Sequence, residues 1–436
     1  MSQYRAYPAY KDSGIEWIGQ VPEHWKIAQI KRISALNPRK STLSEEKDSL
    51  CTFLPMEKLR TNAVTLDETR PIHEVYGGYS YFCDGDILIA KVTPCFENGN
   101  IAVANGLVNG IGFGSTEINV LRVNRKGHNR FLYYRLQEEQ FRTIAKSEMR
   151  GIGGLKRVPT DLFESFTIGL PDTDEQATIA ATLDHETARI DALIEKKTRF
   201  IELLKEKRQA LITHAITKGL DPNAKMKDSG VEWIGQVPEH WDVVQSRRLF
   251  SERKERARDD DKQYTSSQKY GVILQTEFME REGRRIVLVE KGQELLKHIE
   301  SGDFLISMRS FQGGIEECTS SGCVSSAYVP LRPIKWIWHS FFKYLFKSDT
   351  YIQALQRTSD LIRDGQALRF ENFSKVPLLH VPISEQKDIA LFLDNETARI
   401  DALMDKAKQS ITLLKERRAA FITAAVTGQI DLRGKQ

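Results

Sequence analysis

The chain has few of the side-chain groupings that enzymes use for catalysis. The nearest match to a metal-dependent nuclease combines Pro171-Asp172 with Glu195-Lys196-Lys197. Such a site holds its acidic ligands and its lysine close together, usually on a strand hairpin. Here the Glu and the Lys fall in a helical stretch, and a related stretch further along has Asp405 and Ala407 at the matching positions. The His residues show no H-E-x-x-H spacing, and Walker and Pro-Pro-Tyr motifs are absent from the sequence. We therefore expect no catalytic residue, bound metal or cofactor in this chain.

Three kinds of loop carry side chains that suit nucleic-acid binding. Glycine in residues 150–157 and 363–369 lets the backbone approach a phosphate, which arginine or lysine neutralises. Arginine and glutamine also match base edges in the major groove, and a third polar region follows a strand-like segment in each half. The residues we expect to contact DNA are Lys91, Thr93, Asn98, Arg150, Lys156, Arg157, Arg309, Ser310, Gln312, Arg363, Gln366 and Arg369. The alternative for each loop is a solvated basic turn.

An internal repeat organises the chain. Residues 11–25 and 227–241 share 14 of 15 residues around the sequence Pro-Glu-His-Trp, and residues 175–193 and 385–403 share 14 of 19. The segments between these repeats, residues 26–174 and 242–384, have diverged and retain only scattered similarity. Two copies are too few for a solenoid. The pattern predicts a pseudo-two-fold protein with two framework copies and two inserted domains that recognise different targets.

The second pair of repeats predicts two long helices. Each begins near a proline, Pro171 or Pro382, and runs without Pro or Gly to Gly219 or Gly428. About 40 residues at 1.5 Å each give a rod of roughly 60 Å. Apolar residues follow a heptad, so we expect the two helices to pair as a coiled coil. A two-fold relation between the two copies would make the pair antiparallel. The alternative is that each helix packs on its own domain. The residues predicted to form its interface are Leu183, Ile190, Ile194, Ile201, Leu204, Leu393, Ile400, Met404, Ile411 and Leu414.

The predicted fold class is α+β, with two mixed, strand-rich domains separated by the two long antiparallel helices. Gly-rich turns punctuate the inserted domains, residues 81–92 and 303–308 read as strands, and residues 131–136 and 340–345 read as short helices. The expected boundaries are 1–170 for the first recognition domain, 171–219 for the first helix, 220–380 for the second domain and 381–436 for the second helix. His24 and His240 are expected to be structural, and the tryptophans of the repeat are expected to lie in the core.

Composition limits the classes of protein. The 436 residues include 63 Lys plus Arg and 59 Asp plus Glu, a net charge of +4, which permits nucleic-acid binding without demonstrating it. Five scattered Cys argue against a disulfide framework and a tetrahedral zinc site. The sequence shows neither an apolar run long enough to cross a membrane nor a signal peptide, so we expect a cytoplasmic protein.

Together these motifs resemble the specificity subunits of type I restriction-modification systems. The resemblance rests on residues 85–90 and 302–307, on the two copies of EQ-x-x-IA-x-x-LD-x-ETARIDAL, and on LLKE-x-R at 203–208 and 413–418. The endings at 215–219 and 425–431 are also similar. It covers essentially the whole chain.

The resemblance implies a sequence-specific DNA-binding subunit that has no active site. Each inserted domain would be a target recognition domain that reads one half of a bipartite DNA sequence, and the helices would fix the gap. Partners would be double-stranded DNA, two modification (methyltransferase) subunits and restriction (translocase and nuclease) subunits. S-adenosylmethionine, ATP and Mg²⁺ would bind those partners. The alternative is a stand-alone bipartite nucleic-acid-binding regulator.

Overall fold

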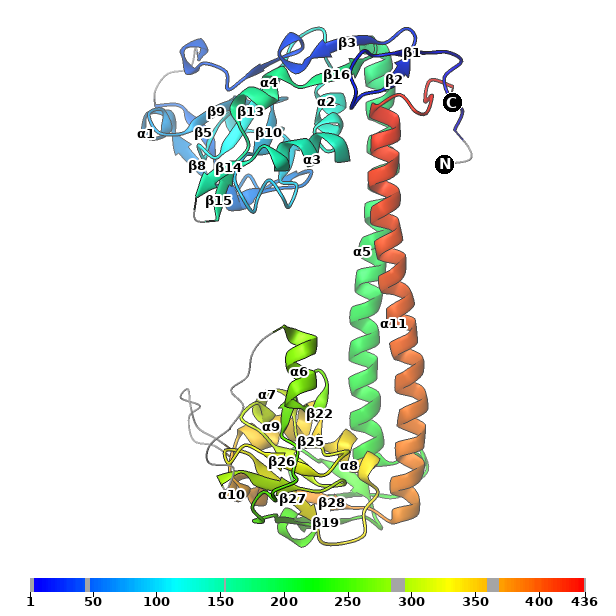
Figure 1. Ribbon diagram of the computed structural model, residues 1–436. Helices are drawn as coiled ribbons and strands as arrows, with labels where there is room; N and C mark the ends of the chain where they lie inside the picture. Colours follow the sequence, from blue (N-terminus) through cyan, green and yellow to red (C-terminus); the bar gives the residue numbers. More distant parts are fainter. Residues whose placement is uncertain (1–3, 44–47, 153, 284–294, 359–367, 435–436) are drawn as a thin grey trace. The chain divides into compact units, whose positions relative to one another are not determined.

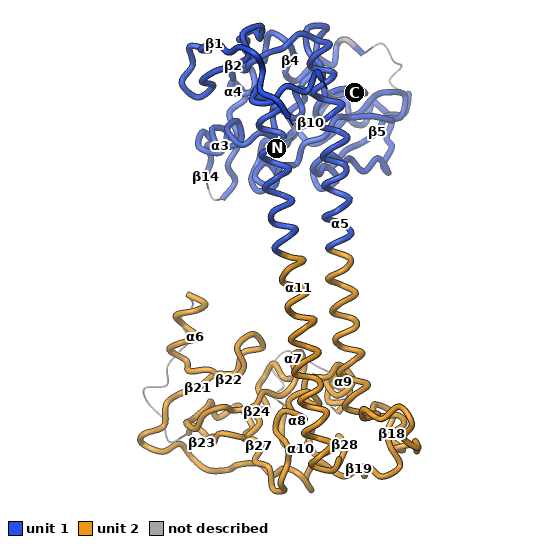
Figure 2. Tube along the Cα trace, turned by 90° about the vertical axis from the view of Figure 1, so that its right-hand side faces the viewer, with its two compact units in different colours: residues 1–197, 409–436 blue, residues 198–408 orange. Residues whose placement is uncertain are grey.

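The chain folds into two compact units, which Figure 2 colours separately. A computed structural model describes residues 4–43, 48–152, 154–283, 295–358 and 368–434. Unit 1 contains residues 1–197 and 409–436, and unit 2 contains residues 198–408. The division falls within two long helices, α5 (Thr173–Lys218) and α11 (Ile383–Val426). Each unit therefore includes the first part of one long helix and the last part of the other.

Unit 1 is built around two four-stranded sheets (Figure 1). The first has the order β11-β10-β13-β4 and the second the order β8-β5-β12-β9. The strands of the first sheet are β4 (Ser34–Leu36), β10 (Ile87–Ala90), β11 (Ile101–Val103) and β13 (Ile118–Val123). Those of the second are β5 (Leu50–Leu54), β8 (Thr69–Pro71), β9 (Ser80–Cys83) and β12 (Ile111–Gly114).

Short strand pairs and helices complete unit 1. The pairs are β1 (Tyr10–Asp12) with β2 (Gln20–Pro22), β3 (Lys26–Gln29) with β16 (Thr167–Leu170), β6 (Leu59–Arg60) with β7 (Ala63–Val64), and β14 (Arg150–Ile152) with β15 (Leu155–Arg157). The short helices are α1 (Ile72–Val75), α2 (Asn129–Arg135), α3 (Glu139–Ser147) and α4 (Thr160–Ser165). A single hydrophobic cluster includes side chains from α2, α3, α4, the start of α5 and the end of α11.

Unit 2 has one four-stranded sheet with the order β20-β27-β24-β25. These strands are β20 (Phe250–Glu252), β24 (Phe304–Ile306), β25 (Glu316–Glu317) and β27 (Val329–Pro333). The strand pairs are β17 (Met226–Asp228) with β18 (Gln236–Pro238), β19 (Asp242–Gln245) with β28 (Pro377–His380), β21 (Tyr264–Ser267) with β22 (Gly271–Leu274), and β23 (Lys297–Ile299) with β26 (Gly322–Val324). The short helices are α6 (Gln275–Glu282), α7 (Ser310–Gly313), α8 (His339–Phe346), α9 (Asp349–Gln356) and α10 (Phe370–Lys375).

The two diverged segments share one core topology. The order β10-β13-β4 in unit 1 corresponds to β24-β27-β20 in unit 2, and all of these pairings are antiparallel. The repeated hairpins also pair in the same register, with Tyr10 opposite Pro22 and Met226 opposite Pro238. The α+β class and the internal repeat are thus confirmed. The predicted helices at 131–136 and 340–345 correspond to α2 and α8.

One predicted strand divides in the structure. The sequence predicts a single strand over residues 81–92, but β9 and β10 are separated by a turn at Asp84-Gly85. Gly85 has a φ of 87°, and Gly302 at the matching turn has a φ of 91°. Glycine adopts this left-handed region without the Cβ clash that other residues meet. Periodicity does not reveal the turn because apolar residues continue on both sides of it.

The long helices run in opposite directions within each unit. In unit 1, Arg418 near the end of α11 lies 2.9 Å from Asp191 in the first half of α5. In unit 2, Arg208 near the end of α5 lies 3.3 Å from Asp401 in the first half of α11. These two ion pairs are equivalent under the internal repeat. Arg208 and Arg418 thus each meet a carboxylate on the other helix.

The residues predicted to form the helix interface, here called the seam, are buried or half-buried along both helices. Of the ten residues predicted to form the helix interface, Leu183, Ile190, Ile201, Leu204, Leu393, Ile400 and Met404 are buried. Ile194, Ile411 and Leu414 are half-buried. In contrast, Leu203 and Leu413, one position before Leu204 and Leu414, are exposed. None of the described helices is apolar enough over a sufficient length to cross a membrane.

This contrast gives a matched test of the seam. Leu204→Asp combined with Leu414→Asp places carboxylates in withdrawn positions, so we expect a loss of about 3 kcal/mol or more in unfolding free energy. Leu203→Asp combined with Leu413→Asp introduces the same charges at exposed positions, and we expect a change of about 0.5 kcal/mol or less. Urea unfolding followed by circular dichroism measures both. Equal destabilisation by the two double variants would contradict the assignment of the seam.

Candidate nucleic-acid interface

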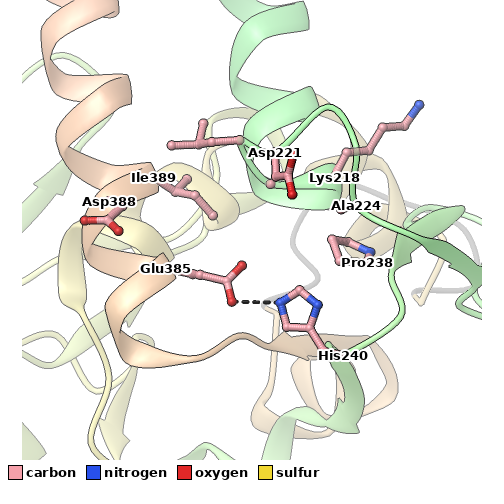
Figure 3. Close-up of a pocket in the computed structure, with 10 residues that line it drawn as sticks. Lys218, Asp221, Ala224, Pro238, His240, Glu385, Asp388 and Ile389 are labelled. Atoms are coloured by element: carbon pink, nitrogen blue, oxygen red, sulfur yellow. Dashed lines mark hydrogen bonds and ion pairs between the residues drawn. The ribbon is translucent and has the colours of Figure 1, made fainter.

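A glutamate at the start of each long helix binds the Pro-Glu-His-Trp repeat. In unit 1, Glu175 accepts hydrogen bonds from Trp25 Nε1 at 3.1 Å and from Tyr7 Oη at 2.7 Å, and its other oxygen lies 2.7 Å from His24 Nε2. In unit 2, Glu385 accepts from Trp241 Nε1 at 3.0 Å and lies 2.7 Å from His240 Nε2 (Figure 3). The two separate sequence repeats therefore bind each other.

The surroundings of the two glutamates differ. The Glu175 side chain is 4% exposed, and Arg433 from the C-terminal segment lies 3.9 Å away. The Glu385 side chain is 36% exposed and lines a cavity of about 340 Å³ together with Lys218, Asp221 and Pro238. Burial, together with the bond to Glu175, raises the pKa of Tyr7 well above its usual value, so this phenol remains a donor. We call Glu175 and Glu385 the anchors of the two helices. Glu175 accepts an additional hydrogen bond from Tyr7, and its side chain is less exposed to water than that of Glu385.

The residues that follow each glutamate attach the helix to its own domain. Gln176 accepts from the backbone N–H of His128 and donates to Pro171 O, and Gln386 does the same with Trp338 and Val381. Further along the helix, Tyr134 donates to Asp184 at 2.7 Å, and Tyr344 donates to Asp394 at the same distance.

These contacts account for most of the repeated helix motif. Thr187 and Thr397 lie 3.0 and 3.1 Å from the same tyrosines, and burial raises the pKa of Tyr344 to about 12. The motif therefore serves to hold the domains on the helices.

The predicted loop at 150–157 is a β-hairpin. Strands β14 and β15 pair from Arg150 opposite Arg157 to Ile152 opposite Leu155, and all six of their residues are exposed. The Ile152 side chain at the tip is 95% exposed. The hairpin is held by Thr93, whose hydroxyl donates to Gly154 O at 2.7 Å and accepts from Lys156 N at 2.9 Å. Two loops that the sequence analysis selected independently therefore meet here.

The cations of this hairpin have different environments. Arg157 makes a two-pronged ion pair with Glu117, with N–O distances of 2.6 to 3.1 Å, and these bonds lower the pKa of Glu117. Arg150 lies 3.6 Å from Glu148, and both of these side chains are largely exposed. For Lys156, no carboxylate of the described residues lies within ion-pair distance. Lys156 is thus the cation best placed to meet a phosphate, whereas Arg157 positions the hairpin.

The remaining predicted contacts in unit 1 lie next to the hairpin. Lys91 is half-buried, and its carbonyl accepts from Val158 N directly after β15. Asn98 is exposed at the end of the turn that follows Thr93. The Thr93 hydroxyl supports the hairpin, and its contact with DNA stays a prediction. Nothing in the structure explains why Ile152 and Leu155 are apolar at so exposed a site.

In unit 2 the predicted residues divide into three groups. Arg309 and Gln312 are exposed at α7, and Arg369 is exposed at the start of α10. Ser310 is a correction: it is fully buried, and its hydroxyl accepts from Ser307 N at 2.9 Å. Arg363 and Gln366 lie outside the described residues. Helix α7 packs on α9, and Asn372 of α10 donates to Thr358 just after α9, so these elements form one local group.

Sequence reasoning missed three supporting carboxylates. Glu117 fixes Arg157, and the buried Asp86 makes a two-pronged pair with Arg122 at 2.7 and 2.9 Å. In unit 2, Asp303 makes an equivalent pair with Arg253 at 2.7 and 3.1 Å. The sequence signal was present as the Gly-Asp of each strand motif, but the arginine comes from a different strand in each unit, so spacing could not identify it.

The fold and the anchored helices define a two-unit protein with an internal repeat, and comparisons with known proteins show what it is similar to. The family described as "Type I restriction modification DNA specificity domain" matches residues 22–203. The chain is 32% identical over 164 residues to the type I restriction enzyme EcoEI specificity subunit of Escherichia coli, which is 37% of this chain and 28% of that protein. It is 36% identical over 167 residues to the EcoAI specificity subunit of the same organism, covering 37% and 27%. The chain thus matches under a third of the length of these relatives.

Solved structures support the fold over nearly the whole chain. A crystal structure of the HsdS subunit from Thermoanaerobacter tengcongensis aligns with a TM-score of 0.57 at 17% identity, covering 94% of this chain and 98% of that one. A structure from work on complex assembly and conformational transition of the type I R-M system aligns with a TM-score of 0.72 at 16% identity, covering 94% and 99%. Residues 22–203 thus resemble the DNA specificity domain of type I restriction-modification systems, and the chain as a whole shares the fold of these solved structures.

The different surroundings of the two anchors predict different mutational effects. Glu175→Gln leaves a buried amide facing the indole and phenol donors, and we expect a loss of about 2–3 kcal/mol in stability. Glu385→Gln is the matched control at a more exposed site, where water can replace the missing bond, and we expect about 1 kcal/mol or less. Thermal unfolding measures both variants. A larger effect for Glu385→Gln would contradict the environments described above.

Proposed function

We propose that this chain is the DNA-specificity subunit of a type I restriction-modification complex. The observation that carries the proposal is the match of residues 22–203 to the family's DNA specificity domain, in a chain whose second half repeats the same core topology. One domain reads each half of a bipartite target, and the length of the long helices sets the spacer between the halves. The same comparisons favour this proposal over a stand-alone regulator.

The β14–β15 hairpin is the proposed DNA-contact element of unit 1. It is exposed on all six strand residues, carries Arg150 and Lys156, and is braced by Thr93 and Glu117 rather than being a free loop. A braced hairpin loses little conformational entropy on binding, and a two-stranded ribbon fits the major groove. In unit 2, Arg309, Gln312 and Arg369 are the corresponding proposed contacts.

The partners follow from the same proposal. Two modification subunits would use S-adenosylmethionine to methylate adenine, and restriction subunits would use ATP and Mg²⁺ to move and cut DNA. This chain would supply recognition and no reacting group. Exposed apolar residues on the long helices, such as Leu193, Leu203, Leu403 and Leu413, offer surface for docking these subunits.

Substitutions in the hairpin test the proposed contact in the assembled complex. We expect Lys156→Ala to weaken DNA binding for all sequences and to reduce the salt dependence by about one ion, because one phosphate is no longer neutralised. Lys31→Ala removes an exposed lysine elsewhere in unit 1 and is the control. Fluorescence anisotropy over a salt series measures both. Unchanged binding in the Lys156→Ala complex would remove the hairpin from the interface.

A genome-wide map of adenine methylation tests the function as a whole. We expect deletion of the gene to abolish methylation at one two-part motif with a fixed gap, and complementation to restore it. Replacing Arg309 and Gln312 by Ala should relax the sequence in one half of the motif only, at about 1–3 kcal/mol for each base that is no longer read. Methylation that persists in the deletion strain, with its partner methyltransferase expressed, would contradict the proposal.

A further inference from the structure

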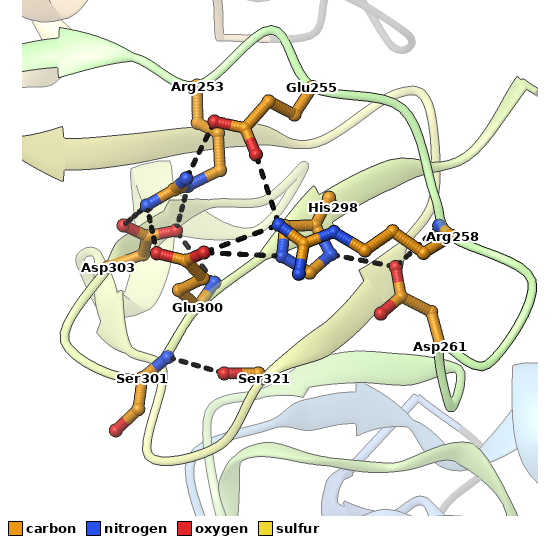
Figure 4. A network of polar contacts seen from close by, with 9 residues as sticks. All are labelled: Arg253, Glu255, Arg258, Asp261, His298, Glu300, Ser301, Asp303 and Ser321. Carbon is orange, nitrogen blue, oxygen red and sulfur yellow. Dashed lines mark hydrogen bonds and ion pairs between the residues drawn. The ribbon is translucent and has the colours of Figure 1, made fainter.

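A cluster of charged side chains lies beside the Gly-Asp turn of unit 2 (Figure 4). Glu255 follows β20, His298 is the central residue of β23, and Glu300 follows β23. The backbone joins the first two, because His298 N donates to Glu255 O at 3.0 Å. One ligand atom from each of Glu255, His298 and Glu300 lies within 4.8 Å of the others. Acidic clusters are common, so the three-residue group requires further evidence to be a site.

The further evidence is the state of the His298 ring. The side chain is 1% exposed, and its Nδ1 lies 2.8 Å from Asp261 Oδ2, which can only accept a hydrogen bond when ionised. Nδ1 therefore carries a proton, and in the neutral imidazole the lone pair of Nε2 faces the cluster. Nε2 is buried, makes no hydrogen bond with any described residue, and lies 3.7 Å from Glu300 Oε1. A carboxylate behind a histidine is the arrangement that orients metal-binding imidazoles.

The charges of the cluster do not balance. Among the described residues, two arginines lie among four carboxylates, which leaves two negative charges in excess when the imidazole is neutral. The carboxylates are Glu255, Asp261, Glu300 and Asp303. Arg253 is buried and pairs with Asp303, Glu300 and Glu255 at 2.7 to 3.0 Å. Its single positive charge is therefore shared by three carboxylates.

The other arginine marks where a further cation would lie. A terminal nitrogen of Arg258 is 3.5 Å from Glu255 Oε2 and 3.5 Å from Glu300 Oε1. Both distances are long for ion-pair hydrogen bonds, which are usually near about 2.8 Å. The Arg258 side chain is 56% exposed and can rotate into solvent. It thus occupies, loosely, a position between two carboxylate oxygens and the buried lone pair.

We propose that Glu255, His298 and Glu300 bind a divalent transition-metal ion such as Zn²⁺, with Arg258 taking its place when the metal is absent. This inference does not depend on the proposed DNA function. An imidazole with two carboxylates suits Zn²⁺ better than Mg²⁺, which prefers oxygen ligands alone. A bound ion would link the segment after β20 to β23 and so fix the edge of the recognition domain.

The geometry requires only small side-chain movements. Two ligands of a tetrahedral zinc ion, each about 2.0 Å from the metal, lie about 3.3 Å apart. His298 Nε2 and Glu300 Oε1 are already 3.7 Å apart. Cys323 lies opposite His298 across the β23–β26 pair, but its sulfur is not among the ligand atoms that lie within 4.8 Å of one another, so it is not counted as a ligand.

Metal titration of the full chain tests the site. After removal of metal with EDTA, we expect one equivalent of Co²⁺ to bind with the visible absorption of a low-coordinate site, and Zn²⁺ to displace it and raise the unfolding temperature. His298→Gln should weaken this binding by about 100-fold or more, since even changes to residues that only orient a metal ligand cost about 10- to 100-fold. His240→Gln, which alters a histidine paired with a single glutamate, is the control and should bind as the parent chain does.

The Arg258→Gln variant keeps the test decisive if His298→Gln fails to fold. Removing the competing guanidinium should tighten Co²⁺ binding by several-fold, an effect that misfolding cannot imitate. The inference is overturned if the parent chain shows no saturable binding, if His298→Gln binds as well as the parent, or if Arg258→Gln binds more weakly.

Discussion

The carboxylate at the start of each long helix makes the interaction on which the rest of the structure depends. Glu175 and Glu385 each bind the indole of a buried tryptophan and the adjacent histidine, and both tryptophans are fully withdrawn from solvent. A charged acceptor for a buried indole N–H is a strong, directional bond, and without it a polar group would be unsatisfied in the core. This bond therefore fixes where each domain begins on its helix. The remaining residues of the helix motif then determine how the domain is held.

This arrangement separates the repeated attachment contacts from the diverged surface elements. The attachment contacts repeat almost atom for atom in the two units, as the paired glutamines and tyrosines show. The core sheet repeats its strand order but not its supporting ion pairs, since Asp86 and Asp303 take their arginines from different strands. The surface elements differ altogether: unit 1 presents a hairpin, and unit 2 presents α7 and the start of α10. The two units are thus alike in the contacts that attach them to the helices and differ most in their surface elements.

Opposite charges on the helices and in unit 2 serve different purposes. The pairs Asp191–Arg418 and Asp401–Arg208 are partly exposed and equivalent under the repeat, so they specify direction more than they add stability. The cluster around His298 combines a buried imidazole and the buried Asp261 and Asp303 with the partly exposed Glu255 and Glu300, and it has an excess of carboxylates. Buried charge of one sign is costly unless a counter-ion is supplied. The same residue types therefore act as an alignment device in one place and form the proposed cation site in the other.

The sequence by itself determined the repeat, the two long helices, the α+β class and the resemblance to type I specificity subunits. These features rest on local periodicity and on identities between segments, which do not depend on where the chain folds back. It also selected both the 150–157 segment and Thr93 as candidate contacts, but it did not show that Thr93 supports the hairpin. Only the tertiary structure decided that Ser310 is buried, that Arg157 is held by Glu117, and that Glu175 joins Trp25 from a distant repeat. Such outcomes depend on which side chains meet across strands far apart in the sequence, and residue type and spacing do not specify those meetings.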